Sequence, residues 1–537
     1  MNKKRVLIGA LVLALAAWMS AGAGFPPQPA SAAAASVPGN YLIVGVDPDY
    51  ESFDPGRAYE VYAQLVTNAV YNTLVNFEGS LDNLVPDLAE SYEVAADATV
   101  FTFHLHQNAV FASGNPVTAA DVVWSFTRLK NLAENPAFLA DGIETIEAVD
   151  DHTVVIRLKG PDSAFLSKLT HAAFSVIDSK LASENGATDA ADASAKDTAK
   201  LWFDSNSAGS GPYVLDSYVP KEQVVLRRND KYWGQAAAFD RIIIRSIQDP
   251  GTQLMMLQKG DIDIAFNLGP ENVKQLAGKK DVAIQEAMSL VISFLVMNND
   301  EAVGGPMANP DVRRAVARAI DYEGLQEIAG AGCATPRSII QLGFLGSLPA
   351  VDPAGARNVE EARELMKKAG FENGFKTTMH VPTVAVEGAD LLTLAQKVQD
   401  DLKGIGIEIE IRPSDVTQAF GVYRDGKVPF GLFYWGPDYP DANNQLAFVA
   451  GGSVAGPRAR WSEADAPELA ALAKQAIAET DNAQRAEYLR KIQETMQDGS
   501  PFIVLLQHGR QFAVRSNVKN ASYIDHCKLN LRAITKE

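Results

Sequence analysis

Few residues in this sequence have the types and spacing that catalysis or metal binding would need. His104 and His106 lie on one face of a predicted strand, a spacing that can ligate a metal. No cysteine or third histidine stands nearby to complete a site, so a structural or surface role is favoured for the pair. Ser210 lies between two glycines but lacks the flanking residues of a nucleophile elbow or phosphate loop.

Acidic pairs at residues 360–361 and 400–401 fall on predicted helices, where solvated faces explain them. No familiar motif of a hydrolase, a nucleotide-binding enzyme or a zinc protease occurs in the chain. We therefore expect no catalytic residue, no metal site and no cofactor, and we expect that the protein is not an enzyme. An exported hydrolase without a familiar motif is the alternative.

The composition is that of a soluble globular protein with large cores. The chain has 537 residues, of which 47% are hydrophobic and 21% are charged, and its length permits more than one domain. The formal net charge is −18, which argues against nucleic acid as a partner because phosphate backbones select basic surfaces. Solubility alone explains the acidity.

The N-terminus has the pattern of an export signal. Three basic residues at positions 3–5 precede an uncharged, largely apolar run over residues 6–24, and prolines follow. The small residues at 30–32 predict cleavage near Ala32, which makes residues 1–32 a signal peptide and the mature protein periplasmic. A retained membrane anchor is the alternative, since the apolar run is long. No cysteine lies at the end of this apolar run, where a lipid would be attached, which disfavours a lipid anchor.

Two cysteines, Cys333 and Cys527, complete the inventory of reactive side chains. An even number of cysteines in an oxidising compartment is compatible with a disulfide between them. Two buried free thiols explain the same pair equally well, and both alternatives stay open.

Strand and helix patterns alternate along the chain. Residues 99–105 and 153–158 are predicted strands, and residues 118–128 form a predicted helix that Thr118 and Asp121 cap. Isoleucines alternate with polar residues over 405–412, which predicts a half-buried strand. This β/α alternation favours a sheet covered by helices.

A late apolar segment adds a constraint on domain organisation. Residues 502–507 (FIVLLQ) predict a buried strand close to the C-terminus. Such a strand must join a sheet, most simply one built by earlier parts of the chain. The sequence therefore suggests lobes that are assembled from non-contiguous segments.

Several motifs occur in a fixed order along the chain: SFDP at 52–55, YNTLV at 71–75, PDLAESY at 86–92, FTFHL at 101–105, VTAADVVWS at 117–125, GPY at 211–213 and RNDKYWG at 228–234. Together they resemble the family 5 extracellular solute-binding proteins, and the resemblance runs from about residue 41 to the C-terminus. Members of this family are the oligopeptide-, dipeptide- and nickel-binding components of ABC importers.

The resemblance implies an α/β fold of the periplasmic-binding-protein type II class, with two lobes, a hinge and an extra subdomain. Lobe I would combine residues 41–74, 209–291 and 498–537. The additional subdomain of lobe I would cover residues 75–208, and lobe II residues 292–497. A late strand that joins distant segments agrees with this division.

A tract rich in aromatic residues and proline, residues 433–441 (FYWGPDYPD), contains the candidate binding site. In peptide-binding members a similar tract supplies an aspartate that pairs with the ligand's α-ammonium, and Asp438 falls on that position. The resemblance implies that Trp435 forms an apolar wall. The main chain of Tyr434, Trp435 and Gly436 would pair with an extended peptide as an added strand. The alternative is that Asp438 only orders a turn.

On the facing lobe, Tyr59, Glu60 and Val61 are similar in position to family residues that touch the ligand; ordinary surface residues at a helix start are the alternative. Longer-peptide binders in the family carry an arginine for the ligand carboxylate where this chain has Leu432. The carboxylate partner is therefore not assigned, and three arginines are unranked candidates: Arg337, Arg458 and Arg460.

Together these features predict an exported substrate-binding protein, expected to be a monomer. It would capture a short peptide between two lobes by hinge closure and deliver it to the permease subunits of an ABC importer. The same fold binding a nickel chelate, an oligosaccharide or an opine is the main alternative. A solute sensor without import is another.

Overall fold

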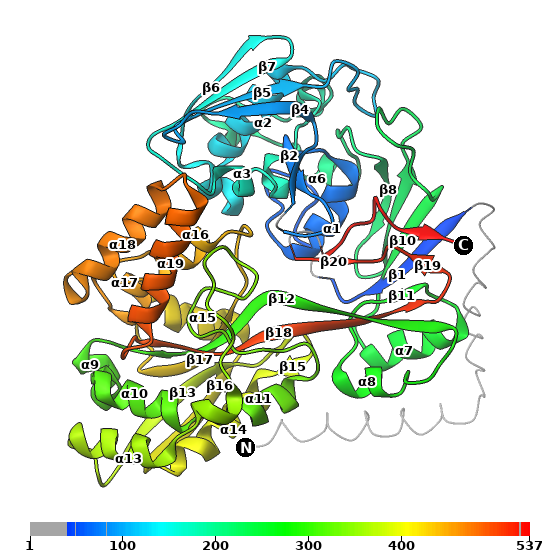
Figure 1. Cartoon of the computed structure of the whole chain (residues 1–537). Coiled ribbons are helices and arrows are strands. Elements are labelled where there is room, and N and C mark those ends of the chain that lie inside the picture. Colours follow the sequence, from blue (N-terminus) through cyan, green and yellow to red (C-terminus); the bar gives the residue numbers. More distant parts are fainter. Residues whose placement is uncertain (1–39, 49, 82, 526–527) are drawn as a thin grey trace, which may run out of the picture. The chain divides into compact units, whose positions relative to one another are not determined.

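A ten-stranded sheet extends through the part of the chain that the structure describes (Figure 1). This computed structural model describes residues 40–48, 50–81, 83–525 and 528–537, without the side chains of residues 61, 354 and 355. The predicted signal peptide lies outside the described residues. The strands in spatial order are β16 (Ile407–Ser414), β13 (Phe375–Pro382), β17 (Phe430–Trp435), β12 (Val282–Met297), β18 (Phe502–Arg515), β11 (Ile264–Ala265), β1 (Tyr41–Val46), β10 (Arg241–Ser246), β9 (Gln223–Arg228) and β8 (Tyr213–Val219).

Two long antiparallel strands, β12 with 16 residues and β18 with 14, lie in the middle of this sheet. Their pairing is interrupted between Met288 and Ile292, where the register shifts. The predicted strand over residues 502–507 is confirmed, and it pairs with distant segments, β12 and β11. It continues to Arg515, beyond its predicted end, because the polar residues that follow Gln507 are buried and remain in the ladder.

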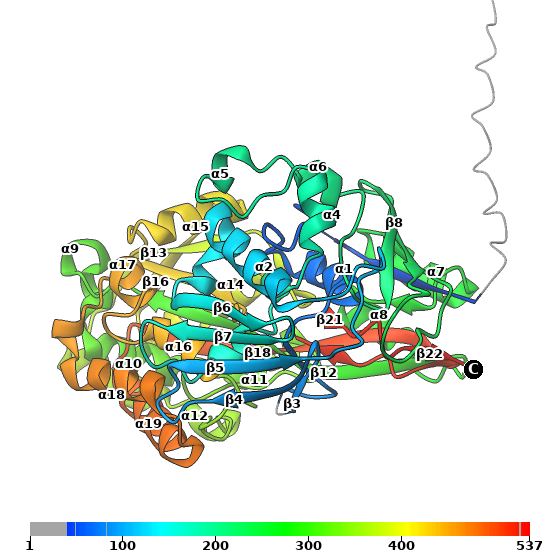
Figure 2. The same ribbon diagram turned by 90° about the horizontal axis from the view of Figure 1, so that it is seen from above.

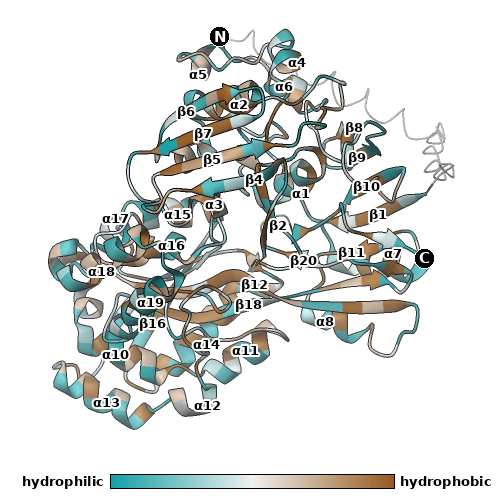
Figure 3. Cartoon of the chain, turned by 45° about the horizontal axis from the view of Figure 1, so that its top comes forward, coloured by the Kyte–Doolittle hydropathy of each residue, from teal (hydrophilic) through white to brown (hydrophobic). Residues whose placement is uncertain are grey.

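The β-strands β12 and β18 contribute to different hydrophobic cores on either side of this interruption. Phe512 and Val514 pack with β1 and β10. At the other end, Leu295 and Met297 face one core and Phe294 and Val296 face another, as the two-residue period of a strand requires. Figure 3 shows these strands as largely hydrophobic, whereas outer helices such as α13 and α18 alternate hydrophilic and hydrophobic residues.

Helices cover the sheet on both faces of its β16–β12 half. One core receives side chains from α10 (Pro310–Ala319), α11 (Tyr322–Ala329), α13 (Val359–Lys368) and α14 (Leu391–Lys403). The opposite core receives them from α15 (Val416–Arg424), α16 (Ala442–Gln445), α17 (Ala455–Ala459), α18 (Pro467–Ala478) and α19 (Asn482–Met496). Towards the other end of the sheet, α1 (Val61–Val70) packs in the core with β1, and α7 (Pro250–Lys259) and α8 (Pro270–Lys274) pack against β11.

A separate four-stranded antiparallel sheet is formed by β4 (Ala89–Val94), β5 (Val100–Leu105), β7 (Thr153–Leu158) and β6 (Ile143–Asp150). The helix α2 (Ala119–Leu132) packs against it, as Figure 2 shows from above. The predicted capping box at its start is confirmed, because the main-chain N–H of Thr118 donates to Asp121 at 2.9 Å. The strands predicted over 99–105, 153–158 and 405–412 are confirmed within two residues as β5, β7 and β16.

A buried group of charges ties α2 to the segment before α1. The Arg128 guanidinium, which is 0% exposed, donates to both oxygens of Asp54, at 2.7 and 2.6 Å. Its Nε donates to Asp197 at 2.8 Å, and Arg57 also pairs with both acids. Two carboxylates are therefore buried beside two guanidinium groups, and each charge depends on its partners because water cannot replace them.

We expect Arg128→Met to destabilise the fold by about 3–5 kcal/mol, because it leaves Asp54 and Asp197 with too little compensating charge. The matched control is Arg227→Met. Arg227 is half exposed and its nearest acid is Asp216 at 3.7 Å, so this change should cost at most about 1 kcal/mol. Urea unfolding followed by far-ultraviolet circular dichroism checks both values. Equal midpoints for the two variants would contradict the account.

His508 lies on β18 next to the interruption and is 1% exposed. Its Nε2 lies 2.7 Å from the Ser293 hydroxyl of β12. Burial lowers the pKa of His508 to about 4, from an ordinary value of 6.5. The folded protein therefore keeps this imidazole neutral at pH values where the unfolded chain protonates it, and stability is lost as the pH falls from about 6.5 towards 4.

We expect the stability advantage of the wild type over His508→Gln to shrink by about 2 kcal/mol between pH 7 and pH 5. Glutamine keeps a polar group near Ser293 but does not titrate, so the comparison isolates the imidazole. Unfolding curves of both proteins at several pH values give the difference. A difference that does not change with pH would show that His508 is not the titrating group.

Candidate functional site

The FYWGPDYPD tract lies where β17 leaves the large sheet. Tyr434 and Trp435 are the last two residues of β17, and they pair with Ser293 and Ile292 of β12. On the other side of β17, the pairing with β13 covers only Phe430 and Gly431 in the described part of the chain. The main chain of Tyr434 and Trp435 is thus held on one side and carries no pairing from β13 on the other.

Both oxygens of the Asp438 carboxylate accept hydrogen bonds. The Tyr59 hydroxyl donates to Oδ1, and Asn444 Nδ2 donates to Oδ2 at 3.1 Å. The Asn444 side-chain oxygen in turn accepts from the indole N–H of Trp435 at 3.2 Å. Asn444 belongs to α16, which Asp441 caps. A short helix therefore orients the carboxylate and the indole towards the same place.

Tyr59 comes from the other end of the chain, 379 residues before Asp438. It precedes Glu60, the N-cap residue of α1. Its ring centroid lies 6.2 Å from that of Phe138 and 6.3 Å from that of His171. Burial and the charge of Asp438 raise the pKa of Tyr59, so the hydroxyl stays protonated and acts as a hydrogen-bond donor.

Aromatic rings pack against one another on the β17 side of the site. The Trp435 ring meets Phe448 edge-on at 5.2 Å between centroids, and Tyr434 meets Phe420 at 5.3 Å. Burial, and then the charge of Glu60, raises the pKa of Tyr434, which places Glu60 within electrostatic range of β17. All of these side chains are partly exposed except Phe448.

The structure brings together five of the seven residues expected to bind the ligand: Tyr59, Glu60, Tyr434, Trp435 and Asp438. Gly436 follows β17 and is exposed. Val61 is the first residue of α1, and its side chain lies outside the described structure. A role of these residues in ligand binding stays a prediction.

Asn444 is a residue of this site that the sequence reasoning missed. The one sequence feature that could have indicated Asn444 is its position six residues after Asp438, in a segment that Asp441 can cap as a helix. No sequence feature indicated that the hydroxyl of Tyr59 would meet Asp438, because the two residues are remote in sequence.

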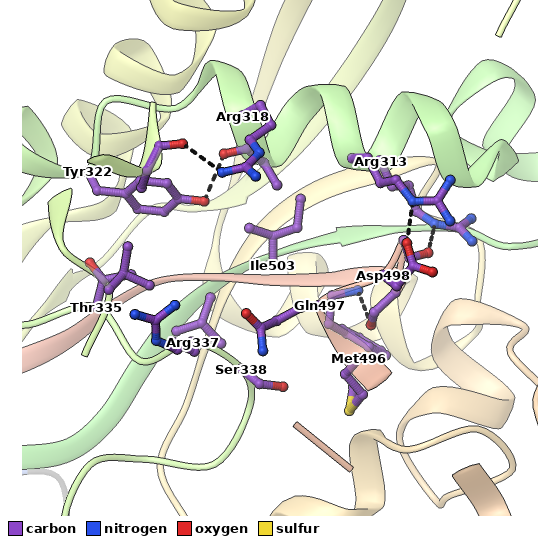
Figure 4. A pocket seen from close by; sticks show the side chains of 18 of the residues that line it. Arg313, Arg318, Tyr322, Thr335, Arg337, Ser338, Met496, Gln497, Asp498 and Ile503 are labelled. Carbon is purple, nitrogen blue, oxygen red and sulfur yellow. Dashed lines mark hydrogen bonds and ion pairs between the residues drawn. The ribbon is translucent and has the colours of Figure 1, made fainter. Parts of the chain in front are cut away.

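The three candidate arginines lie in different surroundings. Arg337 lines a cavity of about 590 Å³, whose lining does not include Trp435 or Asp438. Figure 4 shows it near Thr335 and Ser338, and its Nε donates to the Pro349 carbonyl at 3.1 Å. Arg460 is exposed and donates to the Asp425 carbonyl at 2.9 Å. Arg458 alone of the three lies over the Trp435 ring, at 5.7 Å from its centroid.

The two cysteines give a partial answer. Cys333 is a half-buried free thiol whose sulfur accepts a hydrogen bond from the Gly509 main chain at 3.2 Å. Burial raises its pKa. Cys527 lies outside the described residues, and a disulfide between the two stays a prediction.

Two findings concern the histidine pair and membrane spans within the described residues, which do not include the apolar run at 6–24. His106 stacks near Trp233, with 4.9 Å between ring centroids. Where side chains are described, no three histidine, cysteine or acidic residues are grouped so that they could hold a metal ion. Within the same residues, the helices are all too short or too polar to cross a bilayer.

Relatives of this chain cover most of its length. The probable D,D-dipeptide-binding periplasmic protein DdpA of Escherichia coli is 29% identical over 493 residues, which are 90% of this chain and 92% of the relative. The dipeptide-binding protein of Escherichia coli is 26% identical over 90% of this chain and 92% of its own length. Heme-binding protein A of Haemophilus influenzae is 26% identical over 83% of this chain and 82% of its own length.

Solved structures share the fold. HbpA2 from Haemophilus parasuis superposes with a TM-score of 0.80 at 22% identity, over 93% of this chain and all of the other. The periplasmic binding protein DppA from Helicobacter pylori, in complex with the peptide STSA, has a TM-score of 0.75 at 23% identity, over 93% and 98% of the two chains. The predicted α/β fold of the periplasmic-binding-protein type II class is confirmed.

The family model gives the assignment. The model described as bacterial extracellular solute-binding proteins, family 5 Middle, matches residues 83–456. This range includes the four-stranded sheet, β12, β17 and the Asp438 tract. The chain therefore belongs to the family 5 bacterial extracellular solute-binding proteins.

Proposed function

We propose that this protein is the exported binding component of an ABC importer and that it captures a short peptide by its free amino end. The observation that supports this proposal is the Asp438 carboxylate, which Asn444 orients and which the Tyr59 hydroxyl reaches from a remote segment. The Tyr59 hydroxyl donates to Asp438 from a position that the ammonium group of a ligand could take. The ammonium would donate there as well and would bring a full positive charge. A charge-assisted hydrogen bond is stronger than a neutral one, so an ammonium ion can displace the hydroxyl.

The main chain of the peptide would add to the sheet beside β17. Pairing from β13 ends at Gly431, so that in the described structure the main chain of Tyr434 and Trp435 makes no ladder with β13, and a peptide strand would continue the sheet there. Main-chain hydrogen bonds do not depend on side-chain identity, which suits a protein that accepts varied peptides. Pro437 has no N–H, so this pairing would end there.

Two lobes would close over the peptide. The division we propose assigns residues 41–74, 209–291 and 498–537 to lobe I, 75–208 to its additional subdomain and 292–497 to lobe II. β12 passes from lobe I into lobe II, and its register shift against β18 after Met288 is the proposed hinge. The whole of β18 lies in the lobe I range, but its first half packs in the cores of the lobe II helices, so β18 contacts both lobes. A ligand that contacts both lobes favours the closed form.

The relatives support a peptide as the ligand. Two of them are named for dipeptide binding, and one solved structure of the same fold holds the peptide STSA. We propose that the signal peptide is cleaved near Ala32, that the mature monomer works in the periplasm and that the closed form docks on the permease.

The first test is Asp438→Asn, which removes the negative charge and keeps the shape. We expect the affinity for a peptide with a free amino end to fall by about 2 kcal/mol or more, about thirtyfold, because the ammonium loses its counter-charge. The matched control is Glu463→Gln, an exposed acid paired with Lys474, which should bind as the wild type does. Isothermal titration calorimetry with dipeptides and tripeptides measures both. Unchanged affinity in Asp438→Asn would rule out the ammonium site.

The second test concerns the Tyr59 hydroxyl. In the structure it joins Asp438 across the proposed lobes, so Tyr59→Phe should shift the protein measured without peptide towards an open form with a larger radius of gyration in X-ray scattering. Saturating peptide should close both proteins to the same radius. The matched control is Tyr62→Phe, since the Tyr62 hydroxyl accepts from Asn267 within lobe I. Identical radii for both ligand-free variants would contradict a contact between lobes.

A further inference from the structure

Arg458 is a half-buried cation held against the aromatic wall of the candidate site. It belongs to α17, and its guanidinium carbon lies 5.2 Å from the centroid of the Tyr423 ring and 5.7 Å from that of Trp435. Guanidinium groups stack on aromatic faces and can still donate N–H groups outward in their plane. The two rings and a side-chain hydrogen bond with Tyr423 therefore fix the position of Arg458, and this bond uses only part of the five N–H donors of a guanidinium group.

A second guanidinium lies nearby. Arg424 is the last residue of α15, is exposed, and lies 5.8 Å from the Phe420 ring centroid. It is close enough to Arg458 to lower the pKa of that group, after the larger effect of burial, and close enough to Tyr59 to oppose the rise of its pKa. Two like charges thus lie near each other at the rim of the site.

Neither arginine is paired with a carboxylate where side chains are described, although Arg485 of α19, which packs in the same lobe II core, pairs with Asp441. Asp438 is within electrostatic range of Arg458 but makes no ion pair with it, and bonds instead to Tyr59 and Asn444. A partly desolvated cation beside another cation is costly until an anion reaches it.

A bound peptide brings such an anion. Trp435 connects the two charged groups: its indole N–H bonds to the Asn444 that holds Asp438, and Arg458 lies over its ring. Both groups therefore adjoin one indole, and an extended dipeptide or tripeptide spans at most about 7–11 Å. Leu432, the position at which longer-peptide binders were expected to carry an arginine, is 0% exposed and offers no contact.

We propose that Arg458, with Arg424 at the rim, receives the terminal carboxylate of a dipeptide or tripeptide whose ammonium is held at Asp438. This inference rests on the proposed function and adds the other end of the ligand. It makes the protein selective for short zwitterionic peptides, because both charges must be present and only short chains place them at this spacing.

The test uses the mature protein and three probes, L-alanyl-L-alanine, D-alanyl-D-alanine and trialanine, each also as its C-terminal amide and its N-acetyl derivative. Isothermal titration calorimetry measures the affinities. For the wild type we expect the amides to bind at least about tenfold more weakly than the free acids, since a carboxylate in a bidentate guanidinium pair is replaced by a neutral group. Equal binding of acids and amides would overturn the proposal.

Variants assign the effect to the residue. The Arg458→Gln variant should bind the free acids at least about tenfold more weakly than the wild type, and its affinities for acids and amides should be equal. Arg458→Lys keeps the positive charge but not the bidentate geometry of the guanidinium group, so this variant should retain part of the preference for free acids over amides. The matched control is Arg337→Gln, on the separate cavity of Figure 4, which should behave as the wild type. Thermal unfolding of each variant confirms that it is folded. A preference that persists in Arg458→Gln would overturn the assignment.

The outcomes separate this inference from the proposed function. If N-acetyl peptides bind as tightly as free ones while amides bind weakly, the ammonium site is wrong and the carboxylate site stands. If N-acetyl peptides bind weakly and amides bind as well as acids, the carboxylate site is wrong and the proposed function stands. If no peptide of the panel binds, both fail.

Discussion

The antiparallel pairing of β12 with β18 is the interaction on which the rest of this structure depends. Each strand is long enough to pack in more than one hydrophobic core, so the same two segments belong to both halves of the large sheet. Ladder hydrogen bonds on either side of the register shift hold each half firmly. The shift itself removes regular pairing from a few residues after Met288, and this interruption of the ladder is the reason for proposing the hinge there.

A buried ion network surrounds this interruption and limits what can move. Glu387 pairs with Arg510 of β18, accepts from the Ser289 hydroxyl of β12 at 3.0 Å and lies 3.8 Å from Lys528. Burial alone would raise the pKa of Glu387, but Arg510 and Lys528 lower it to about 2. The network therefore stays charged at neutral pH. Arg510 also donates to the Phe266 carbonyl at 2.8 Å, so one side chain connects Glu387 with the segment that follows β11.

Local patterns in the sequence predicted local structure well. The alternation of isoleucines gave β16, the Thr118–Asp121 spacing gave the capped start of α2, and the apolar run from residue 502 gave the start of β18. The end of β18 was missed because His508 and Arg510 are polar and resemble a loop. They are buried only because Ser293 and Glu387, both distant in sequence, supply their partners. Periodicity cannot report on such partners.

The same limit applied to the candidate site. Motif resemblance placed Asp438 and Trp435 in one tract and Tyr59 in another, but the hydrogen bond between Tyr59 and Asp438 depends on how the chain folds back. Three arginines were equivalent candidates in the sequence, and surroundings distinguish them: one lines a remote cavity, one lies at the exposed surface and one lies over Trp435.

The two charged regions differ in how their charges are compensated. At the interruption of β12 and β18, each buried charge has a protein partner of opposite sign. At the candidate site, within the described part of the chain, Asp438 accepts from neutral donors, and Arg458 contacts aromatic rings and Tyr423; neither makes an ion pair. Charges without ionic partners favour a ligand that supplies them, because a zwitterion compensates both at once. This contrast is the physical reason for proposing the ligand site at Asp438 and Arg458 and not in the network around Glu387.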